Sequence, residues 1–224
     1  MSATESLPEL ATDYRISREQ IESFRKDGYV LLGSVASAEE IAPYRSIILA
    51  ARDRFGAERT PLAQRDTYGK AFLKGMNLWE KDEGVRRFVL SPRFGKIAAD
   101  LLGVQGVRVY HDQALVKEPG GGLTPWHQDQ HYWPLDTDNT ITMWMPLVDL
   151  TAEMGTMHFA SGSHRQRYLG DRPISDESEQ ALAALIRSQN FHIVPGVPMR
   201  AGDATFHYGW TLHGAPGNST AQAR

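Results

Sequence analysis

The chain has no cysteine among its 224 residues. This absence excludes disulfides, thiolate metal sites and cysteine nucleophiles together, so a metal would have to be held by His, Asp or Glu. An excess of charge of one sign is also missing, because 24 basic residues stand against 27 acidic ones and the net charge is -3. Neither nucleic acid nor a membrane surface is therefore expected as a partner, and small molecules are favoured.

Long apolar runs are absent as well. No stretch approaches the roughly 20 apolar residues that span a bilayer, and the first residues contain acids without the apolar core of a signal peptide. We therefore expect a cytoplasmic protein. Its 41% hydrophobic content suits a chain that buries a single core, and a homodimer is compatible with the sequence.

The chain divides by pattern into a tail and one domain. Residues 1–13 lack periodicity and predict a flexible N-terminal tail. Residues 14–224 predict a single domain, with a helical part over 14–105 and a β core over 106–224.

Helix signals are strongest in the first part. Ser17 and Ser37 each begin a capping box, completed by Gln20 and Glu40 three positions later. The predicted helices cover residues 17–27, 37–55, 79–89, 91–103 and 175–189. Between them, residues 56–76 predict a long loop, which is either a lid over a site or disordered.

Short strands separated by turn residues dominate after Gly106. One predicted strand, 29–32, lies earlier in the chain. The predicted strands after Gly106 cover residues 107–111, 113–118, 126–132, 139–147, 155–160, 191–194, 204–208 and 210–213. This order is typical of a mainly β protein with flanking α-helices, built as a sandwich or barrel.

The clearest candidate for a metal-binding motif is the stretch Trp126-His127-Gln128-Asp129-Gln130-His131. In an extended strand, His127 and Asp129 leave the same face and can point at one metal ion. Two His and one carboxylate suit Fe(II), because they leave positions open for a cosubstrate and O2.

A third ligand must come from another part of the chain, and the candidates are His158, His164, His192, His207 and His213. His213 is favoured because its strand ends in a turn and Arg224 follows eleven residues later. A guanidinium near an iron site can form a bidentate pair with a dicarboxylate.

Two strands have faces that bear on such a site. Gln113 and Lys117 share one face, and a lysine directed inward would need an anion. In the second strand, Thr142 and Trp144 lie opposite an apolar face. The alternative leaves Lys117 in solvent at a strand end and Trp144 in the core.

Taken together, these motifs resemble a known family. W-H-x-D, G-T-M-x-F-x-x-G-S-H and L-H-G-A-P-x-N, with an arginine eleven residues after the last histidine, are similar to the phytanoyl-CoA dioxygenase family of Fe(II)/2-oxoglutarate-dependent oxygenases. The resemblance covers about residues 27–224. It implies a double-stranded β-helix, a cupin-like jelly roll of two four-stranded antiparallel sheets with helices on one side.

The resemblance also implies roles for single residues. His127, Asp129 and His213 match the iron ligands, and Arg224 matches the arginine that holds the distal carboxylate of 2-oxoglutarate. Lys117 and Trp144 match further cosubstrate contacts, and Gln113 is grouped with them because it shares the face of Lys117. The family continues past this arginine into another core strand, so we expect Arg224 to be poorly held here.

The implied cofactors are Fe(II), 2-oxoglutarate and O2, and the implied reaction oxidises an unactivated C–H bond, ending in hydroxylation, ring closure or epimerisation. The chain is similar to antibiotic-tailoring members that act on nogalamycin-type glycosides. We expect the substrate wall to include Trp126, Gln128, His131, Tyr132, Trp133, Tyr208 and Trp210.

Two other functions fit the sequence. A cupin-like zinc or manganese isomerase or hydrolase could use His131 as a fourth ligand and would activate water without O2. A jelly-roll binding module without enzymatic activity would keep the fold and bind no metal.

Overall fold

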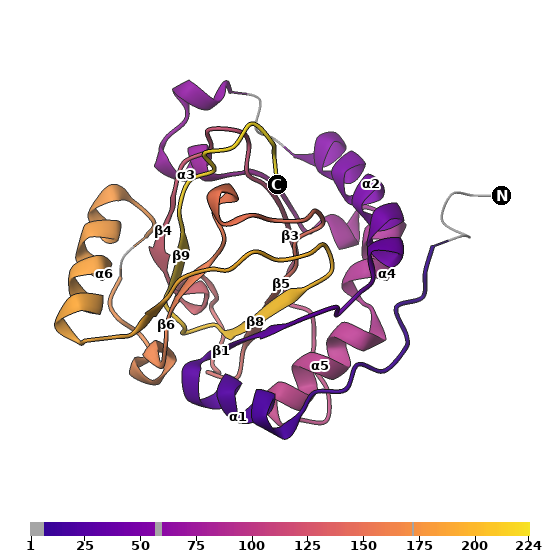
Figure 1. Cartoon of the computed structure of the whole chain (residues 1–224), viewed down its shortest axis with the longest axis horizontal. Coiled ribbons are helices and arrows are strands. Elements are labelled where there is room, and N and C mark those ends of the chain that lie inside the picture. The colour runs from indigo at the N-terminus through magenta and orange to yellow at the C-terminus, as the bar shows by residue number, and fades with distance from the viewer. Residues whose placement is uncertain (1–6, 57–59, 172) are drawn as a thin grey trace.

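The computed structural model describes residues 7–56, 60–171 and 173–224 (Figure 1). The α-helices are α1 Arg18–Asp27, α2 Ala38–Phe55, α3 Thr67–Ala71, α4 Glu83–Val89, α5 Pro92–Leu102 and α6 Asp176–Ser188. The strands are β1 Tyr29–Leu32, β2 Leu73–Met76, β3 Gln113–Val116, β4 Thr124–His127, β5 Ile141–Trp144, β6 His158–Ala160, β7 Ile193–Val194, β8 Ala204–Tyr208 and β9 His213–Ala215.

The strands form two antiparallel sheets that meet face to face. One has the order β1-β8-β5 and the other β4-β9-β6-β7, while β2 and β3 pair separately. The rings of Tyr29 in β1 and Phe159 in β6 stack across the interface with centroids 4.3 Å apart. This arrangement confirms the predicted mainly β jelly roll with flanking helices. The resemblance implied two sheets of four strands each. Among the described residues, one sheet has four strands and the other has three.

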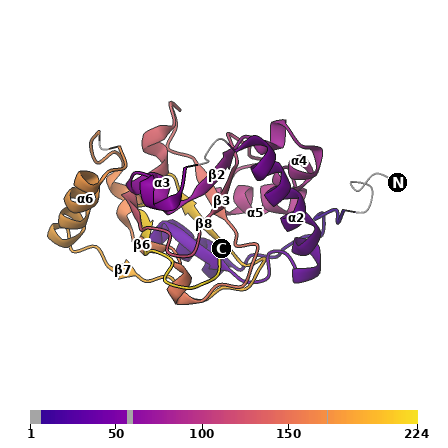
Figure 2. The same ribbon diagram turned by 90° about the horizontal axis from the view of Figure 1, so that it is seen from above.

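Side chains along the strands of the three-stranded sheet point alternately to two faces. One face packs against the helices and the other faces the second sheet. Val30, Phe206 and Met143 are register neighbours across β1, β8 and β5, and they pack into the main hydrophobic cluster with residues of α1, α2, α4 and α5. The next row along the same strands, with His207 and Thr142, faces the other sheet. Figure 2 shows the helical layer on one side of the sheets.

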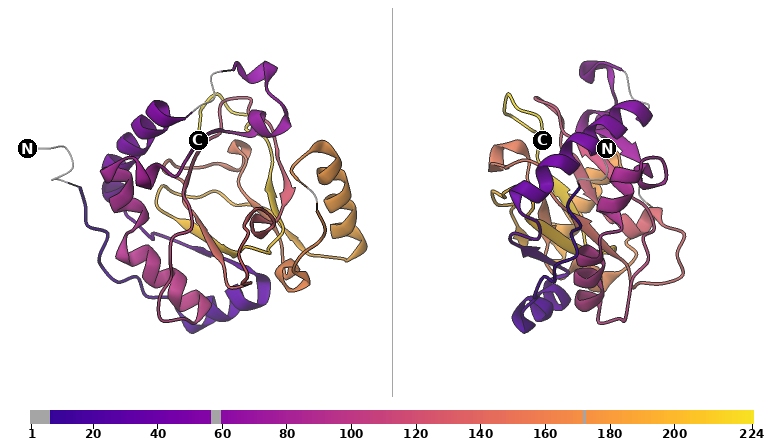
Figure 3. Two further views of the ribbon diagram at one scale, coloured as in Figure 1. Left: turned by 180° about the vertical axis from the view of Figure 1, so that it is seen from behind. Right: turned by 90° about the vertical axis from the view of Figure 1, so that its right-hand side faces the viewer.

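Helix α6 stands apart from that layer. It packs on β4, on the opposite side of the molecule from α2, α4 and α5 (Figures 1 and 3). Its Leu182 and Ile186 are buried together with Ala160 and Leu212. Over the parts of the chain that the structure describes, no helix has the length and apolar character needed to cross a bilayer.

Local signals placed α1 and α2 correctly, whereas the helix predicted over 79–89 is divided into a 3-10 turn at Leu78–Glu80 and α4, and α3 was not predicted. Ser17 and Ser37 are N-caps with both hydrogen bonds of the capping box formed, and Gly28 ends α1 at φ 86°. In this left-handed conformation, glycine avoids the strain that a side chain would cause.

Several predicted boundaries were wrong. Residues 107–111 form no strand, the strand predicted over 126–132 ends at His127, and the one predicted over 210–213 starts only at His213. The stretch 56–76 contains a 3-10 turn at Leu62–Gln64, α3 and β2, apart from residues 57–59, which lie outside the described residues.

The prediction of a flexible tail is wrong for residues 7–13. Leu7 and Leu10 are buried in the main cluster, and the carbonyl of Leu10 accepts a hydrogen bond from the Ser91 hydroxyl at 2.9 Å. Arg93 donates to the carbonyl of Thr12 at 2.9 Å. Tertiary contacts with α5 hold a segment that has no periodicity of its own, and residues 1–6 lie outside the described residues.

Candidate metal centre

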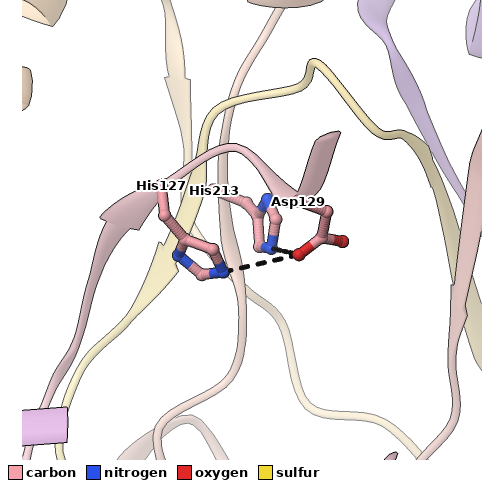
Figure 4. A group of neighbouring side chains, drawn as sticks. All are labelled: His127, Asp129 and His213. Atoms are coloured by element: carbon pink, nitrogen blue, oxygen red, sulfur yellow. Dashed lines mark ion pairs between the residues drawn. The ribbon is translucent and has the colours of Figure 1, made fainter. Parts of the chain in front are cut away.

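The three side chains of the candidate site come from two paired strands and a turn (Figure 4). His127 is the last residue of β4 and lies opposite His213, the first residue of β9. Asp129 begins the 3-10 helix Asp129–Tyr132. The expectation of one continuous strand through both residues was wrong, yet the turn still brings the carboxylate to the same side as the imidazole.

The donor atoms of the three residues converge. One ligand atom from each of His127, Asp129 and His213 lies within 4.8 Å of the other two. Oδ1 of Asp129 is 3.6 Å from Nε2 of His127 and 3.7 Å from Nε2 of His213. These separations are too long for hydrogen bonds, so the three atoms surround a common point without satisfying one another.

Backbone carbonyls fix the orientation of both imidazoles. Nδ1 of His127 donates to the carbonyl of Pro125 at 2.7 Å, and Nδ1 of His213 donates to the carbonyl of Thr211 at 2.9 Å. Because a carbonyl only accepts, the proton sits on Nδ1 and the lone pair on Nε2. Metal-binding histidines are commonly oriented in this way.

Burial keeps these imidazoles neutral. It lowers the pKa of His127 to about 4, with a smaller effect from His213. It also lowers the pKa of His213 to about 4, helped by His207. Neutral imidazole is the form that binds a metal, so both side chains are in the binding form at neutral pH.

Asp129 is held ionised, with its second oxygen occupied. Burial alone would raise its pKa, but His213 and the hydrogen bond from His207 outweigh burial and lower the pKa below its usual range. Oδ2 accepts from the Thr142 hydroxyl at 2.7 Å and from Nε2 of His207 at 3.1 Å. Only Oδ1 therefore faces the two imidazoles.

This donor set fits Fe(II). Two neutral imidazoles and one carboxylate on one side of a point form the facial arrangement typical of non-haem iron oxygenases. Among the described residues, the potential metal-binding group contains these three side chains and not His131. The imidazole of His131 instead lies 3.4 Å from the exposed carboxylate of Asp171. The alternative function, a zinc or manganese isomerase or hydrolase, therefore lacks His131, the fourth ligand that the sequence suggested for it.

A buried lysine and a half-buried arginine lie close to each other near the strands that hold the triad. Lys117 is 0% exposed, and its Nζ donates to the carbonyl of Gly122 at 2.5 Å. The Arg224 guanidinium lies 5.4 Å from the Trp144 ring centre. The Phe72 ring is shared, with Lys117 Nζ at 4.7 Å and Arg224 Cζ at 5.6 Å from its centre.

In the described parts of the chain, neither Lys117 nor Arg224 takes part in an ion pair. Burial, followed by the charge of Arg224, lowers the pKa of Lys117 to about 7. Burial lowers the pKa of Arg224 to about 10. On β5, Thr142 contacts Asp129 and Trp144 contacts Arg224. The two positions are about 7 Å apart along the strand. The cations therefore border the metal centre and offer a place for an anion.

Arg224 is firmly held, against the expectation. Its backbone pairs with that of Lys117 in both directions, at 2.7 and 3.0 Å, and its Nε donates to the carbonyl of Met154 at 2.9 Å. Asn218 is buried nearby and its side-chain amide donates to the carbonyls of Glu118 and Gln222 at 3.1 and 2.7 Å. Asn218 lies in the L-H-G-A-P-x-N motif, but its role as a clamp was missed.

Gln113 and Phe72 differ from the prediction in opposite ways. Gln113 is exposed at the first position of β3, opposite Met76 in the pairing, so it does not share the burial of Lys117. Phe72 lies in the predicted loop 56–76, where no periodic pattern pointed to a buried aromatic ring. Its contact with both cations became visible only in the structure.

Alternation splits the predicted substrate wall. Trp126 precedes His127 on β4, so its ring points to the other face and packs with the α6 cluster. Tyr208 follows His207 and likewise turns outward, where its ring lies 4.3 Å from that of Phe24. Both rings therefore lie on the faces turned away from the triad, which argues against the place predicted for them in the wall.

Of the remaining wall residues, Gln128, His131 and Tyr132 line one pocket, whereas Trp133 and Trp210 are not part of its lining. The pocket is lined by His127, Gln128, His131, Tyr132, Leu169, Gly170 and Leu182. Trp133 packs on His111, with ring centres 5.6 Å apart. Trp210 lies 6.2 Å from the Tyr168 ring, and its indole donates to Asp138 at 2.6 Å.

Comparison with known proteins identifies related sequences over nearly the whole chain. The family model described as "Phytanoyl-CoA dioxygenase (PhyH)" matches residues 24–224. A probable alpha-ketoglutarate-dependent hypophosphite dioxygenase from Stutzerimonas stutzeri is 25% identical, covering 92% of this chain and 75% of its own. An ectoine dioxygenase from Stutzerimonas stutzeri (strain A1501) is 24% identical, with 93% and 74% covered.

Solved structures of similar shape include two enzymes of nogalamycin biosynthesis. The non-heme alpha-ketoglutarate-dependent carbocyclase SnoK superposes with a TM-score of 0.78 at 29% identity, covering 94% of this chain and 81% of its own. The epimerase SnoN, in complex with Fe3+, alpha-ketoglutarate and nogalamycin RO, has a TM-score of 0.76 at 28% identity, with 92% and 79% covered.

Proposed function

The chain belongs to the phytanoyl-CoA dioxygenase family, and from this premise we propose that His127, Asp129 and His213 hold its iron while Lys117 and Arg224 hold 2-oxoglutarate. The protein is an Fe(II)/2-oxoglutarate-dependent dioxygenase that acts on a small organic molecule. Bound iron supplies the oxidation of an unactivated C–H bond by O2, coupled to the conversion of 2-oxoglutarate to succinate and CO2.

One observation carries the metal assignment. Two imidazoles with Nδ1 tied to carbonyls and one carboxylate with Oδ2 tied to Thr142 and His207 leave three donor atoms facing one point. A core histidine with only a structural role would instead have both nitrogens satisfied by the protein. The spare donor capacity of this group is what a metal would use.

Lys117 and Arg224 supply the charge that binds the cosubstrate. A dicarboxylate would replace the missing counter-charge of Lys117 and Arg224, and the planar guanidinium suits a carboxylate geometrically. The rings of Phe72 and Trp144 lie against this pair. Charge-assisted bonds are stronger where burial lowers the local dielectric constant. Together these residues orient the cosubstrate toward the triad. Gln113, which the sequence grouped with Lys117, is exposed at the start of β3. It therefore contributes least to the proposed binding of the cosubstrate.

For the substrate, we place its binding surface on residues 128–133 and the facing segment 167–171. The two are tied together, because the Gln128 amide donates to the carbonyl of Arg167 at 2.8 Å. The rings of His131 and Tyr168 lie nearly parallel, at 13° with centres 6.2 Å apart. Tyr168 is 55% exposed and Tyr132 44%. Exposed rings beside a metal centre favour a flat, ring-bearing substrate.

This surface supports a polyketide or glycoside of antibiotic biosynthesis as the substrate, in keeping with the likeness to SnoK and SnoN. The test is a screen of coupled succinate formation with anthracycline glycosides, ectoine and hypophosphite. We expect succinate above the uncoupled rate with ring-bearing compounds, and mass spectrometry of the product then distinguishes hydroxylation, ring closure and epimerisation. Coupling only with ectoine or hypophosphite would refute the proposed substrate class.

Replacing Asp129 tests the metal assignment. Asp129→Ala removes the single anionic donor, so we expect loss of iron-dependent 2-oxoglutarate turnover with the fold preserved. The readouts are succinate formation and the weak visible charge-transfer band in an anaerobic titration with Fe(II) and 2-oxoglutarate. The exposed acid Asp13 provides a matched control, Asp13→Ala. Native turnover in Asp129→Ala would show that the triad is not the iron site.

Three expectations from the sequence stay predictions. They are a cytoplasmic location, the absence of nucleic-acid and membrane partners, and a possible homodimer. Fractionation of cells and light scattering of the purified protein test the first and the last.

A further inference from the structure

His207 is a buried histidine that the proposed reaction leaves without a task. It is the next-to-last residue of β8, and only 1% of its surface is exposed. Its ring centre is 4.3 Å from that of His213 and 5.5 Å from that of Phe159. Its Nε2 lies 3.1 Å from Oδ2 of Asp129. It was one of the five candidates for the third ligand, but it is outside the group of converging donor atoms.

Packing alone does not explain a histidine at this position. Nδ1 of His207 is buried and has no hydrogen-bond partner in the described part of the chain. An unpaired buried nitrogen is destabilising, and an apolar ring of similar volume would avoid it. The benefit that offsets this loss is on the other nitrogen, which donates to an ionised carboxylate.

The strand register shows how this donor is placed. His207 on β8 pairs directly with Thr142 on β5, and both side chains reach Oδ2 of Asp129. Two donors from neighbouring strands therefore hold the same carboxylate oxygen. A carboxylate fixed in this way cannot rotate to present both oxygens to the point between His127 and His213.

We propose that His207 is a positioning residue: with Thr142, it holds Asp129 so that a single oxygen is offered to the metal and the positions needed by 2-oxoglutarate and O2 stay open. This inference rests on the proposed iron site. It assigns to His207 no contact with metal, cosubstrate or substrate.

The test compares His207→Phe, which keeps a ring but removes the donor, with His207→Gln, which keeps a donor on a shorter group. Thr142→Val removes the second donor at almost constant volume. For each variant, the Fe(II) dissociation constant is measured anaerobically with saturating 2-oxoglutarate, together with the position of the charge-transfer band and the melting temperature without metal.

We expect His207→Phe to bind Fe(II) about 10- to 100-fold more weakly, as is typical when a partner of a metal ligand is lost. Its band should shift, while its metal-free melting temperature should not fall. His207→Gln should recover most of the affinity, and Thr142→Val should weaken binding in the same direction as His207→Phe. If His207→Phe does not fold, the Gln and Val variants alone decide.

Native affinity and an unshifted band in folded His207→Phe, or in both other variants, would overturn the inference. A lower metal-free melting temperature with unchanged affinity would do the same, because it would mean that the residue only packs. The wild-type protein separates this failure from failure of the proposed function. If the wild type forms no band with Fe(II) and 2-oxoglutarate, the iron site itself is wrong.

Discussion

Lys117 follows directly after β3 and is fully buried, yet its ammonium group contacts a carbonyl, a hydroxyl and an aromatic ring rather than a carboxylate. Burial lowers its pKa to about 7, whereas an unfolded chain keeps it near 10.4. The unfolded state therefore binds more protons between these two values, and the free energy of unfolding rises with pH across this window. A buried lysine of this kind weakens the cosubstrate-free fold, which fits a residue kept for an anionic ligand.

We predict that this pH dependence disappears in Lys117→Met. Without 2-oxoglutarate, the unfolding free energy of the wild type should rise relative to the variant between pH 7 and 9, as measured by urea denaturation. Saturating 2-oxoglutarate should protect the wild type and have little effect on the variant. The exposed Lys26 gives the control Lys26→Met, which should follow the wild type. A parallel course of wild type and Lys117→Met would contradict the assignment.

The two ligand histidines predict a similar rise of stability with pH, but in the acid range. Burial lowers the pKa of both His127 and His213 to about 4, while an unfolded histidine titrates near 6.5. Between pH 6.5 and 4 the unfolded state binds more protons, so the metal-free protein should lose stability as the pH falls. The double variant His127→Gln/His213→Gln should lose less over the same range in thermal melts. An equal loss would mean that other groups cause the acid sensitivity.

At the scale of elements, the segment after β9 shapes the cosubstrate pocket. Asn218 holds this segment through three backbone carbonyls, among them those of Glu118 and Gln222. Arg224 is thereby paired with the end of β3. We predict that Asn218→Ala weakens 2-oxoglutarate binding by about tenfold, since buried hydrogen bonds of this kind contribute about 1 kcal/mol each. Fe(II) affinity without cosubstrate should stay close to that of the wild type.

Calorimetric or fluorescence titration measures both constants. The exposed Asn139 offers a control, Asn139→Ala, which should bind 2-oxoglutarate normally. If Asn218→Ala lowers iron affinity as strongly as 2-oxoglutarate affinity, the segment supports the whole site and not the pocket for the anion alone.

The elements also show what a sequence can predict. Both capping boxes are local signals that need no tertiary partner, and α1 and α2 begin where Ser17 and Ser37 place them. Strand limits depend on partners elsewhere in the chain, so the strand predicted over 126–132 turned into β4 followed by a 3-10 helix. Phe72 was missed for the same reason, because only the folded chain brings it to Lys117.

The candidate site followed from strand spacing and from the resemblance together. The i, i+2 spacing indicated His127 and Asp129, whereas His213 was chosen among five histidines through its motif; the donor atoms of the three residues lie within 4.8 Å of one another. Strand alternation then decided which neighbours face the site, and it turned Trp126 and Tyr208 away from it. Neither the hydrogen bond from His207 nor that from Thr142 could be predicted, because both depend on the register between β5 and β8 and on how the two sheets pack.

At the scale of the whole molecule, ligand binding connects the two sheets. The triad lies on β4, β9 and the turn after β4, while its supports His207 and Thr142 lie in the other sheet. The cation pocket adds β3, β5 and the segment after β9. A ligand set bound across these elements is bound only by the folded chain, so binding must raise the melting temperature.

We predict the size of this shift from the linkage relation. At ligand concentrations about 100-fold above the dissociation constant, the gain is about 2.7 kcal/mol, which for a chain of this length corresponds to roughly 5 to 10 °C. Anaerobic differential scanning calorimetry with Fe(II) and 2-oxoglutarate measures it. Asp129→Ala should lose the shift produced by iron, and Lys117→Met should lose only the additional shift produced by 2-oxoglutarate. Because the two variants remove different parts of the shift, a common loss in both would show that the metal centre and the cation pocket do not bind separate ligands.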